Sequence, residues 1–231
     1  MVGSRCNASD ATRESNLTTT DTPSVHEKIT AHRLLPVIAL PDAGLADPLA
    51  DALVAGGLPV AEVTLRTDAA EASIRAMAKR GDLIVGAGTV LTVDQAELAV
   101  GAGAEFVVAP GTSPSVIEWC QAKGVPIYPG VATPTDITTA VSLGVEVVKF
   151  FPAEALGGVK TLKAFAAPFG GVKFVPTGGI GPGNLAEYLA IDAVAACGGS
   201  WMVSKAWLSE RAFDQVESAT REAIGLVRRH G

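Results

Sequence analysis

The 231-residue chain carries 24 acidic and 18 basic side chains, a formal charge of −6, with 48% apolar and 18% charged residues. These figures exclude a disordered chain and argue against a nucleic-acid or anionic-membrane partner, because such partners are bound by clustered Lys and Arg. The 25 glycines and 14 prolines, with only 5% aromatic residues, predict many tight turns around an aliphatic core. This composition is typical of α/β proteins.

Histidine and cysteine are scarce, which limits the chemistry. The histidines lie near the ends of the chain, at His26, His32 and His230. The cysteines are far apart and form no CxxC pair, at Cys6, Cys120 and Cys197. We therefore expect no metal site, no other cofactor and no disulfide framework, as suits the reducing cytoplasm.

Residues 1–27 are rich in Ser, Thr, Asp and Asn, and we expect a disordered polar tail there. The tail has no apolar stretch of the kind a signal peptide needs. No apolar run in the chain reaches the ~18 residues of a membrane span, so no membrane partner is expected. Residues 28–231 are expected to form a single domain.

Eight short β-type runs recur at start-to-start spacings of 20 to 26 residues. They begin at Leu34, Val60, Leu83, Glu105, Pro126, Glu146, Val172 and Ala193. Eight strands at so regular a spacing predict an α/β fold of the (β/α)8 type, the TIM barrel. The length that follows the tail fits the small end of that fold's range.

Helical segments fill several of the intervals, and they end at a glycine before the next strand. The clearest are DAAEASIRAMAKRG from Asp68, DQAELAVGAGA from Asp94, SPSVIEWCQAKG from Ser113 and PTDITTAVSLG from Pro134. A doubly wound open sheet repeats the same strand and helix unit, and it is the main alternative to the barrel. In either fold, the ligand site is expected at the carboxyl ends of the strands.

The run that begins at Val60 places charged groups on the face expected to point into the barrel. Its period of two sets Glu62, Thr64 and Arg66 on one face, and an apolar set on the face that must meet the helices. Glu62 and Arg66 are then either a buried structural ion pair or a proton-transfer carboxylate beside a cationic anchor for an anionic substrate.

The run before Pro152 repeats this arrangement around a lysine. Lys149 shares a face with Val147 and Phe151 near the carboxyl end of its strand. An apolar surround favours the neutral, nucleophilic form of an amine. Lys149 is therefore either a nucleophile or a lysine whose stem is buried while its ammonium group reaches solvent.

Two glycine-rich turns follow the seventh and eighth predicted strands. PTGGIG contains Gly178 and Gly179, and CGGSW contains Gly199 and Ser200. In (β/α)8 barrels the backbone N–H groups of these two loops commonly bind phosphate, so the turns predict a phosphate site. Thr89, in the turn after the third strand, is expected to donate its hydroxyl at the mouth of the barrel.

Seven segments together resemble the 2-dehydro-3-deoxy-phosphogluconate (KDPG) aldolases, which are also active as 4-hydroxy-2-oxoglutarate (KHG) aldolases. They run in order between about residues 34 and 205, and they are GGLPVAEVTLRT, VGAGTVLT, FVVAPGTSP, YPGVATPTDI, VVKFFPAE, VPTGGI and CGGSW. As a set they are highly specific, although each alone would be weak. The polar tail before residue 28 departs from the family.

The resemblance implies a class I aldolase on a (β/α)8 barrel that uses no metal, with Lys149 as the Schiff-base lysine and Glu62 as the acid and base. The substrate contacts that it implies are Arg66 and Thr89 for the carboxylate, Pro110 and Phe151 along the pocket, and Gly178, Gly179, Gly199 and Ser200 for the phosphate. It further implies a cytoplasmic homotrimer whose partners are pyruvate and 2-keto-3-deoxy sugar acid phosphates.

Two other kinds of protein remain open on the residues alone. A phosphosugar isomerase or synthase on the same barrel would use the same phosphate loops, but it has no need of a desolvated lysine in the sixth strand. A non-catalytic sugar-phosphate sensor would keep the pocket and could lose the nucleophile. The joint presence of Glu62, Arg66 and Lys149 favours the aldolase.

Overall fold

The computed structural model describes residues 23–230 of the chain. The strands are β1 (Leu34–Ile38), β2 (Val60–Thr64), β3 (Ile84–Gly88), β4 (Phe106–Val108), β5 (Ile127–Tyr128), β6 (Gly130–Val131), β7 (Val147–Phe150), β8 (Lys173–Phe174) and β9 (Cys197–Gly199). The α-helices are α1 (Val25–His32), α2 (Ala46–Ala55), α3 (Ala70–Arg80), α4 (Val93–Gly101), α5 (Pro114–Ala122), α6 (Pro134–Ser142), α7 (Gly158–Ala166), α8 (Leu185–Leu189), α9 (Lys205–Glu210) and α10 (Phe213–His230). Three 3-10 helices are η1 (Ala43–Leu45), η2 (Glu154–Leu156) and η3 (Trp201–Val203).

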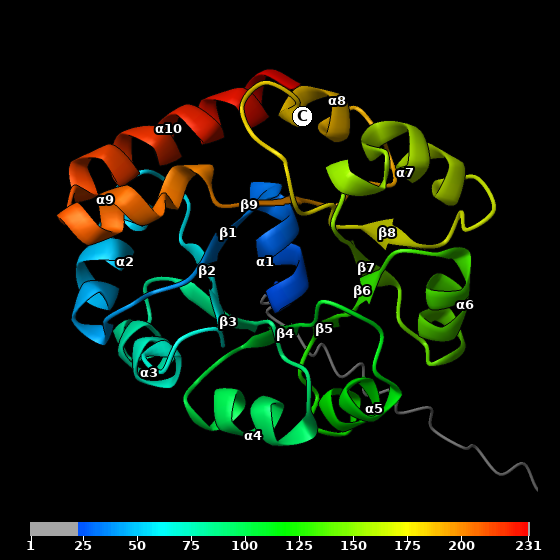
Figure 1. Cartoon of the computed structure of the whole chain (residues 1–231), viewed down its shortest axis with the longest axis horizontal. Helices are drawn as coiled ribbons and strands as arrows, with labels where there is room; N and C mark the ends of the chain where they lie inside the picture. The colour runs from blue at the N-terminus through cyan, green and yellow to red at the C-terminus, as the bar shows by residue number, and fades with distance from the viewer. Residues whose placement is uncertain (1–22, 231) are drawn as a thin grey trace, which may run out of the picture.

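The strands pair in parallel and form two sheets. One has the order β5-β4-β3-β2-β1-β9 and the other the order β6-β7-β8. Neighbours in space are neighbours in sequence, except that β9 lies beside β1. This order lacks the reversal that defines a doubly wound sheet, so the observed topology disagrees with that alternative. Figure 1 shows the strands in the middle and most of the helices around them.

The fifth predicted strand is divided between the two sheets. β5 pairs with β4, and β6, which follows Pro129, pairs with β7. Proline has no N–H to donate to a ladder, which explains why the pairing changes at this residue. On the other side, isolated parallel bridges join Phe174 to Val194 and Thr177 to Gly198. The fold shown is therefore an α/β arrangement of parallel strands surrounded by helices.

Capping explains where several helices begin and end. The Thr92 hydroxyl accepts the Gln95 N–H at the start of α4, and Thr133 forms a capping box with Asp136 at the start of α6. Each of these bonds satisfies an N–H group that the helix leaves free at its first turn. Gly81 ends α3 with φ 73°, a conformation that glycine adopts without steric cost.

Helix α1 begins before the predicted end of the tail. Ser24 and Glu27 form a capping box that opens α1 at Val25, so residues 25–27 are helical although the predicted boundary put them in the tail. Residues 1–22 of that predicted tail lie outside the described part of the chain. Buried Ile29 explains why the helix packs against the domain.

The amino-terminal ends of the strands are where α1 lies. The His26 Nδ1 and the Tyr128 hydroxyl are 2.9 Å apart, and a surface groove beside α1 is lined by Pro59, Leu83 and Glu105, which precede or open three strands. α1 thus covers the end opposite to the one where the ligand site is expected. In residues 23–230, no helix has both the length and the apolar composition that crossing a bilayer requires.

Candidate active site

Glu62 points inward from a strand that is buried along its whole length. All five residues of β2 are buried, and Glu62 itself has 0% exposure. The next strand leaves room for its carboxylate at Gly88, where a Cβ would stand 2.3 Å from Glu62 Oε1. Because real Cβ atoms do not approach so closely, any larger residue at this position would force the Glu62 side chain to shift. The predicted inward face of this strand is confirmed for Glu62.

Lys149 reaches the same interior from the opposite sheet. Phe150 points outward, where its ring meets Phe165 of α7 edge-on at 5.8 Å between centroids. Lys149 therefore points inward, and its side chain is 7% exposed. The ring of Phe151 lies 5.4 Å from Nζ, which places the amine over an aromatic face.

The two side chains meet inside the molecule. Lys149 Nζ donates to Glu62 Oε1 at 3.1 Å, and this contact connects the six-stranded sheet with the three-stranded one. The second carboxylate oxygen, Oε2, is buried and has no hydrogen-bond partner among the described residues. A buried polar atom without a partner is costly and uncommon, and active sites are where such atoms gather.

The alternative of a Glu62–Arg66 ion pair is wrong. β2 ends at Thr64, so Arg66 stands in the following turn and is exposed, outside the buried interior. Its Nε donates instead to the Thr64 hydroxyl at 3.1 Å, and that hydroxyl donates to the Ile38 carbonyl at 2.7 Å. The remaining nitrogens of Arg66 make no hydrogen bond with a described residue.

Thr89 lies beside this turn in a strained conformation. The Leu65 N–H donates to the Gly88 carbonyl at 2.8 Å, which brings the turn of Arg66 next to Thr89. Thr89 has φ 60°, in the left-handed region that β-branched residues avoid. Such strain is found at ligand sites, where the rest of the fold holds the residue in place.

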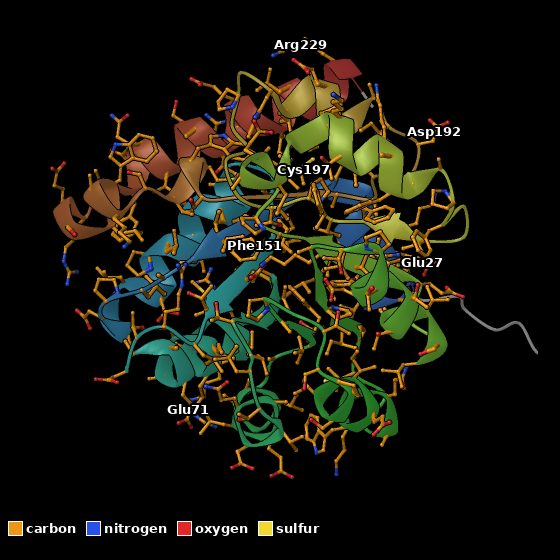
Figure 2. The ribbon with its side chains drawn as sticks, turned by 45° about the vertical axis from the view of Figure 1, so that its right-hand side comes forward. Glu27, Glu71, Phe151, Asp192, Cys197 and Arg229 are labelled. Carbon is orange, nitrogen blue, oxygen red and sulfur yellow. The ribbon has the colours of Figure 1, made fainter. Side chains whose placement is uncertain are left out.

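Pro110 and Phe151 border the position of Lys149. Gly130 is the register partner of Lys149, and a Cβ at Gly130 would stand 2.1 Å from the Pro110 carbonyl oxygen. The Phe151 N–H donates to the Val131 carbonyl at 3.2 Å. Figure 2 shows Phe151 near the middle of the molecule, whereas Glu71, Asp192 and Arg229 lie at its rim.

The first glycine turn is held by its carbonyl oxygens. Those of Thr177 and Gly178 accept from the N–H groups of Ala153 and Glu154, at 2.8 and 3.0 Å, and that of Gly179 accepts from the Asn184 side chain at 3.1 Å. Among residues 23–230, no acceptor receives the N–H of Gly178 or of Gly179. The turn thus presents unused backbone donors, as an anion-binding loop does.

The second glycine turn lies next to the first. The bridge between Thr177 and Gly198 joins them, and a Cβ at Gly198 would stand 2.2 Å from the Thr177 Oγ1. Gly199 is buried under the Trp201 ring, while Ser200 is exposed. The two predicted phosphate turns are therefore adjacent at the carboxyl ends of β8 and β9.

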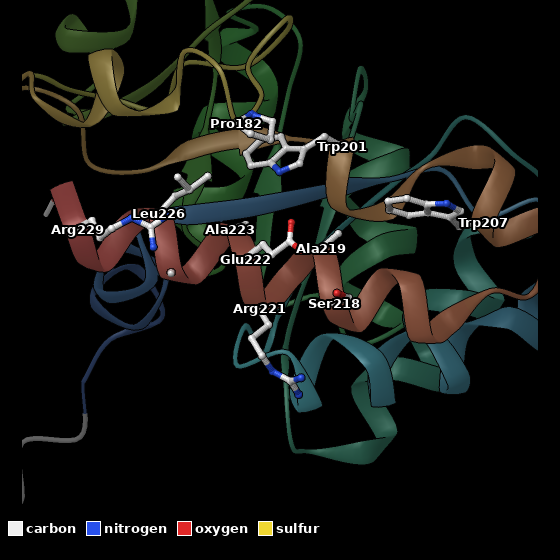
Figure 3. Close-up of a pocket in the computed structure, with 11 residues that line it drawn as sticks. Pro182, Trp201, Trp207, Ser218, Ala219, Arg221, Glu222, Ala223, Leu226 and Arg229 are labelled. Atoms are coloured by element: carbon white, nitrogen blue, oxygen red, sulfur yellow. The ribbon is translucent and has the colours of Figure 1, made fainter.

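A large surface groove includes neither Glu62 nor Lys149 in its lining. It measures about 880 Å³ and is lined by Trp201, Trp207 and residues of α10 (Figure 3). A smaller hollow of about 250 Å³ is lined by Arg66 together with Lys205 of α9. In the described residues, no three His, Cys, Asp or Glu side chains converge as a metal site requires, so we assign no metal ligand.

Sequence reasoning missed the residues that support the site rather than line it. Gly88 and Gly130 leave the space that Glu62 and the neighbourhood of Lys149 need. The buried Thr177 side chain packs on the second glycine turn. Of these residues, only Thr177 could have been found from the sequence, because its hydroxyl lies between a predicted strand and a Gly-Gly pair.

Comparison with known proteins identifies the family of this chain. Residues 25–219 match the family described as KDPG and KHG aldolase. The chain belongs to the KDPG and KHG aldolase family. The predicted membership and the prediction of a carbon–carbon lyase are thereby confirmed.

Three individual relatives agree with this family. A 2-dehydro-3-deoxy-phosphogluconate aldolase of Haemophilus influenzae is 45% identical over 90% of this aldolase and 98% of its own length. The solved KDPG aldolase of Legionella pneumophila, which holds pyruvate as a covalent carbinolamine, is 37% identical with a TM-score of 0.83 over 86% of this chain and 97% of that one. The solved Zymomonas mobilis enzyme, with 3-phosphoglycerate, is 38% identical with a TM-score of 0.81 over 86% and 95%.

Proposed function

We propose that this aldolase reversibly cleaves KDPG to pyruvate and glyceraldehyde 3-phosphate, and KHG to pyruvate and glyoxylate, through an imine on Lys149. The observation that carries the proposal is the buried contact between Lys149 Nζ and Glu62 Oε1 at 3.1 Å. An amine that is desolvated beside a carboxylate can lose its proton to that carboxylate and attack a carbonyl carbon. The pyruvate carbinolamine in the Legionella relative supports the same chemistry.

The reaction begins when the neutral amine attacks the C2 ketone of the substrate. Glu62 returns the proton of the amine to the departing hydroxyl, and loss of water forms the protonated imine, which withdraws electrons from the C3–C4 bond. Glu62 takes the proton of the C4 hydroxyl as this bond breaks, and the aldehyde leaves. The electron pair remains as an enamine, which Glu62 protonates at C3. Hydrolysis of the imine releases pyruvate and restores the amine.

Arg66 and Thr89 bind the substrate carboxylate in this proposal. Arg66 is exposed in the turn after β2, and Thr89, with its strained backbone, lies next to the same turn. A carboxylate fixed at this point presents C2 to Lys149 and no other carbonyl. Pro110 and Phe151 form the walls that keep the amine out of water.

The phosphate group binds the two glycine turns. The free N–H groups of Gly178 and Gly179, with Gly199 and Ser200 in the adjacent turn, supply donors without adding charge. Phosphate held there secures the far end of KDPG, so substrates without phosphate should react more slowly.

The proposal extends to the architecture and the assembly. The segment 127–131 belongs to both sheets, and the bridges at Thr177 and Phe174 connect them on the other side, which supports closure into a (β/α)8 barrel. Resemblance to the family supports a homotrimer in the cytoplasm.

Borohydride trapping tests the central step. Reduction in the presence of pyruvate should leave a covalent adduct, which peptide mass spectrometry should locate at Lys149. The Lys149→Ala variant should yield no adduct. Lys173→Ala is a matched control, because Lys173 lies on neighbouring β8 and donates to the Asp192 carbonyl at the surface. An adduct that persists in Lys149→Ala would overturn the proposal.

A further inference from the structure

The segment that follows Lys149 also supports the first glycine turn. Ala153 and Glu154, four and five residues after the lysine, donate their N–H groups to the carbonyls of Thr177 and Gly178. A Cβ at Gly179 would stand 2.6 Å from both Cβ and Cγ of Glu154, so the stem of this side chain packs directly against the glycine. The position of Glu154 therefore influences where the free N–H groups of Gly178 and Gly179 point.

Tyr188 holds the other end of the Glu154 side chain. Its hydroxyl donates to Glu154 Oε1, and its own side chain, from α8, is among the largest that are fully buried. A buried ring has one orientation, so the hydroxyl is a fixed point. Burial and the bond to Glu154 raise the Tyr188 pKa, which keeps the hydroxyl protonated and able to donate.

The geometry points to Tyr188 as a positioning residue for substrate phosphate: by holding the Glu154 carboxylate, it fixes the Glu154 stem against Gly179 and so aims the N–H groups of Gly178 and Gly179. The inference rests on the phosphate-binding role proposed above. Tyr188 touches no substrate in this inference, and it should affect phosphate binding but not the chemistry at Lys149. These two effects can be measured separately.

The test compares a phosphorylated and a phosphate-free substrate in the full-length Tyr188→Phe variant, which loses the hydroxyl but keeps the ring. For KDPG we expect kcat/KM to fall on the order of tenfold, mainly through KM, which corresponds to about 1.4 kcal/mol. For KHG, and for proton exchange at the pyruvate methyl, we expect changes within about twofold, since neither uses the glycine turn.

Tyr128→Phe is the matched control, because Tyr128 is also buried and its hydroxyl bonds His26 at the far end of the strands. It should leave the KM for KDPG unchanged. Glu154→Gln keeps the stem and an oxygen that can accept from Tyr188, so it should lose less than Tyr188→Phe. If Tyr188→Phe did not fold, Glu154→Ala, which truncates an exposed side chain, would give the same comparison.

Equal losses for KDPG and KHG in Tyr188→Phe, or no loss beyond that of Tyr128→Phe, would overturn the inference while leaving the proposed function intact. Failure of the proposed function shows elsewhere, in the wild type. If inorganic phosphate did not compete with KDPG in the wild-type enzyme, the phosphate role of the glycine turns would be wrong, and the positioning role with it.

Discussion

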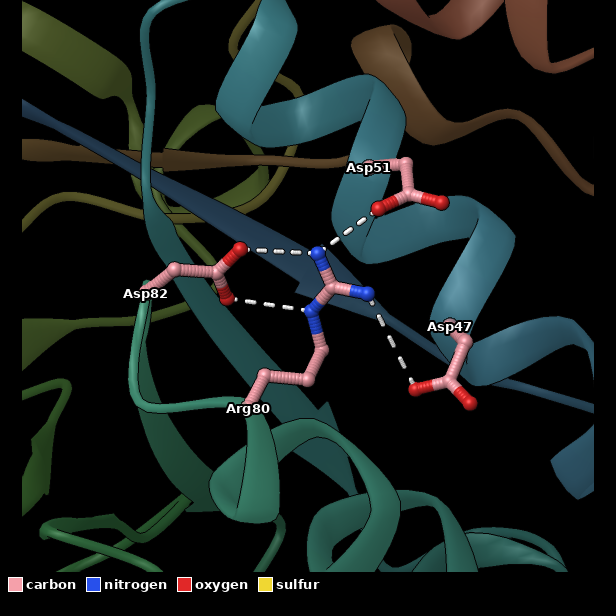
Figure 4. A network of polar contacts seen from close by, with 4 residues as sticks. All are labelled: Asp47, Asp51, Arg80 and Asp82. Atoms are coloured by element: carbon pink, nitrogen blue, oxygen red, sulfur yellow. Dashed lines mark hydrogen bonds and ion pairs between the residues drawn. The ribbon is translucent and has the colours of Figure 1, made fainter.

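Glu62 and Arg80 both form ion pairs, but the pair of Glu62 is buried and those of Arg80 lie at the surface. Among residues 23–230, Glu62 has one partner, Lys149, and both side chains are almost fully buried. Arg80 contacts three carboxylates at the surface, Asp82 at 2.8 Å, Asp51 at 2.7 Å and Asp47 at 4.0 Å (Figure 4). The surface cluster has more ion pairs, but the buried pair is the one to which we assign the chemistry.

Solvent explains this difference. Each exposed ion pair is screened by water and contributes about 0 to 1 kcal/mol to stability. The Arg80 cluster therefore connects the end of α3 to α2 with only a small effect on the free energy of unfolding. Desolvation of a buried ion pair costs several kcal/mol. Such a pair is therefore not needed for the stability of the fold. The Glu62–Lys149 pair is therefore best explained by the reaction, whereas the Arg80 cluster needs no function beyond structure.

The largest expected effect is at the buried carboxylate. Glu62→Gln should slow proton exchange at the pyruvate methyl by roughly 10²- to 10⁴-fold, because the amide cannot carry the proton. The fold should persist, since the amide oxygen can still accept from Lys149. Loss of the methyl signal in D2O, followed by NMR, measures the exchange. Exchange at the wild-type rate would remove Glu62 from the proposed mechanism.

A smaller effect should follow from crowding the same carboxylate. Gly88→Ala introduces a methyl group 2.3 Å from Glu62 Oε1, so the carboxylate must shift from its present position beside Lys149. Displacement by about 1 Å can cost on the order of 10²-fold in turnover, and overpacking costs about 1 to 3 kcal/mol in stability. Steady-state kinetics and urea unfolding measure the two losses.

Gly101→Ala is the control for that substitution. Gly101 ends α4, and nothing lies within 4 Å of the position its Cβ would take. Alanine there should leave turnover unchanged and should not destabilise the fold. Equal turnover in the two variants would show that the space at Gly88 does not set the position of Glu62.

The smallest effect is expected in the surface cluster. Asp82→Asn should lower the free energy of unfolding by about 0.5 to 1 kcal/mol at neutral pH and leave turnover unchanged. The hydrogen bond from Arg80 lowers the Asp82 pKa below its ordinary value of 3.8. The stability contribution is therefore complete above the unfolded value and is lost as pH falls through the lower folded value.

Denaturant unfolding at several pH values checks this sign. Wild type and Asp82→Asn should differ at pH 7 and converge as the pH is lowered below 3.8, and added salt should narrow the difference at pH 7. A difference that grows on acidification would contradict the assignment. A loss of activity in Asp82→Asn would show that the Arg80 cluster is not purely structural.

Much of the fold could be predicted from periodicity. The strands at Leu34 and Val60 begin where the sequence predicted. Helices α3, α5 and α6 lie in the predicted segments, and α4 begins one residue before its segment. The division of the fifth strand at Pro129 was missed, because a local pattern does not show which neighbour each half pairs with. The prediction placed residues 25–27 of α1 in the tail, because the capping box of this helix lies among polar residues.

The candidate site divides in the same way. The inward faces of Glu62 and Lys149 followed from the alternation of a strand, and the two glycine turns followed from their place after the last strands. The partner of Glu62 did not follow, and neither did the roles of Gly88 and Tyr188. These depend on side chains that come from different elements, which no spacing along the chain encodes.

The sequence by itself determined local features of this protein: which side chains share a strand face, roughly where several helices lie, and which turns are rich in glycine. Only the tertiary structure decided that Lys149, 87 positions beyond Glu62, is the cation that reaches this carboxylate, while the nearby Arg66 is not. The physical reason is that strand alternation is a property of adjacent residues, whereas a contact across the interior depends on how two sheets face each other.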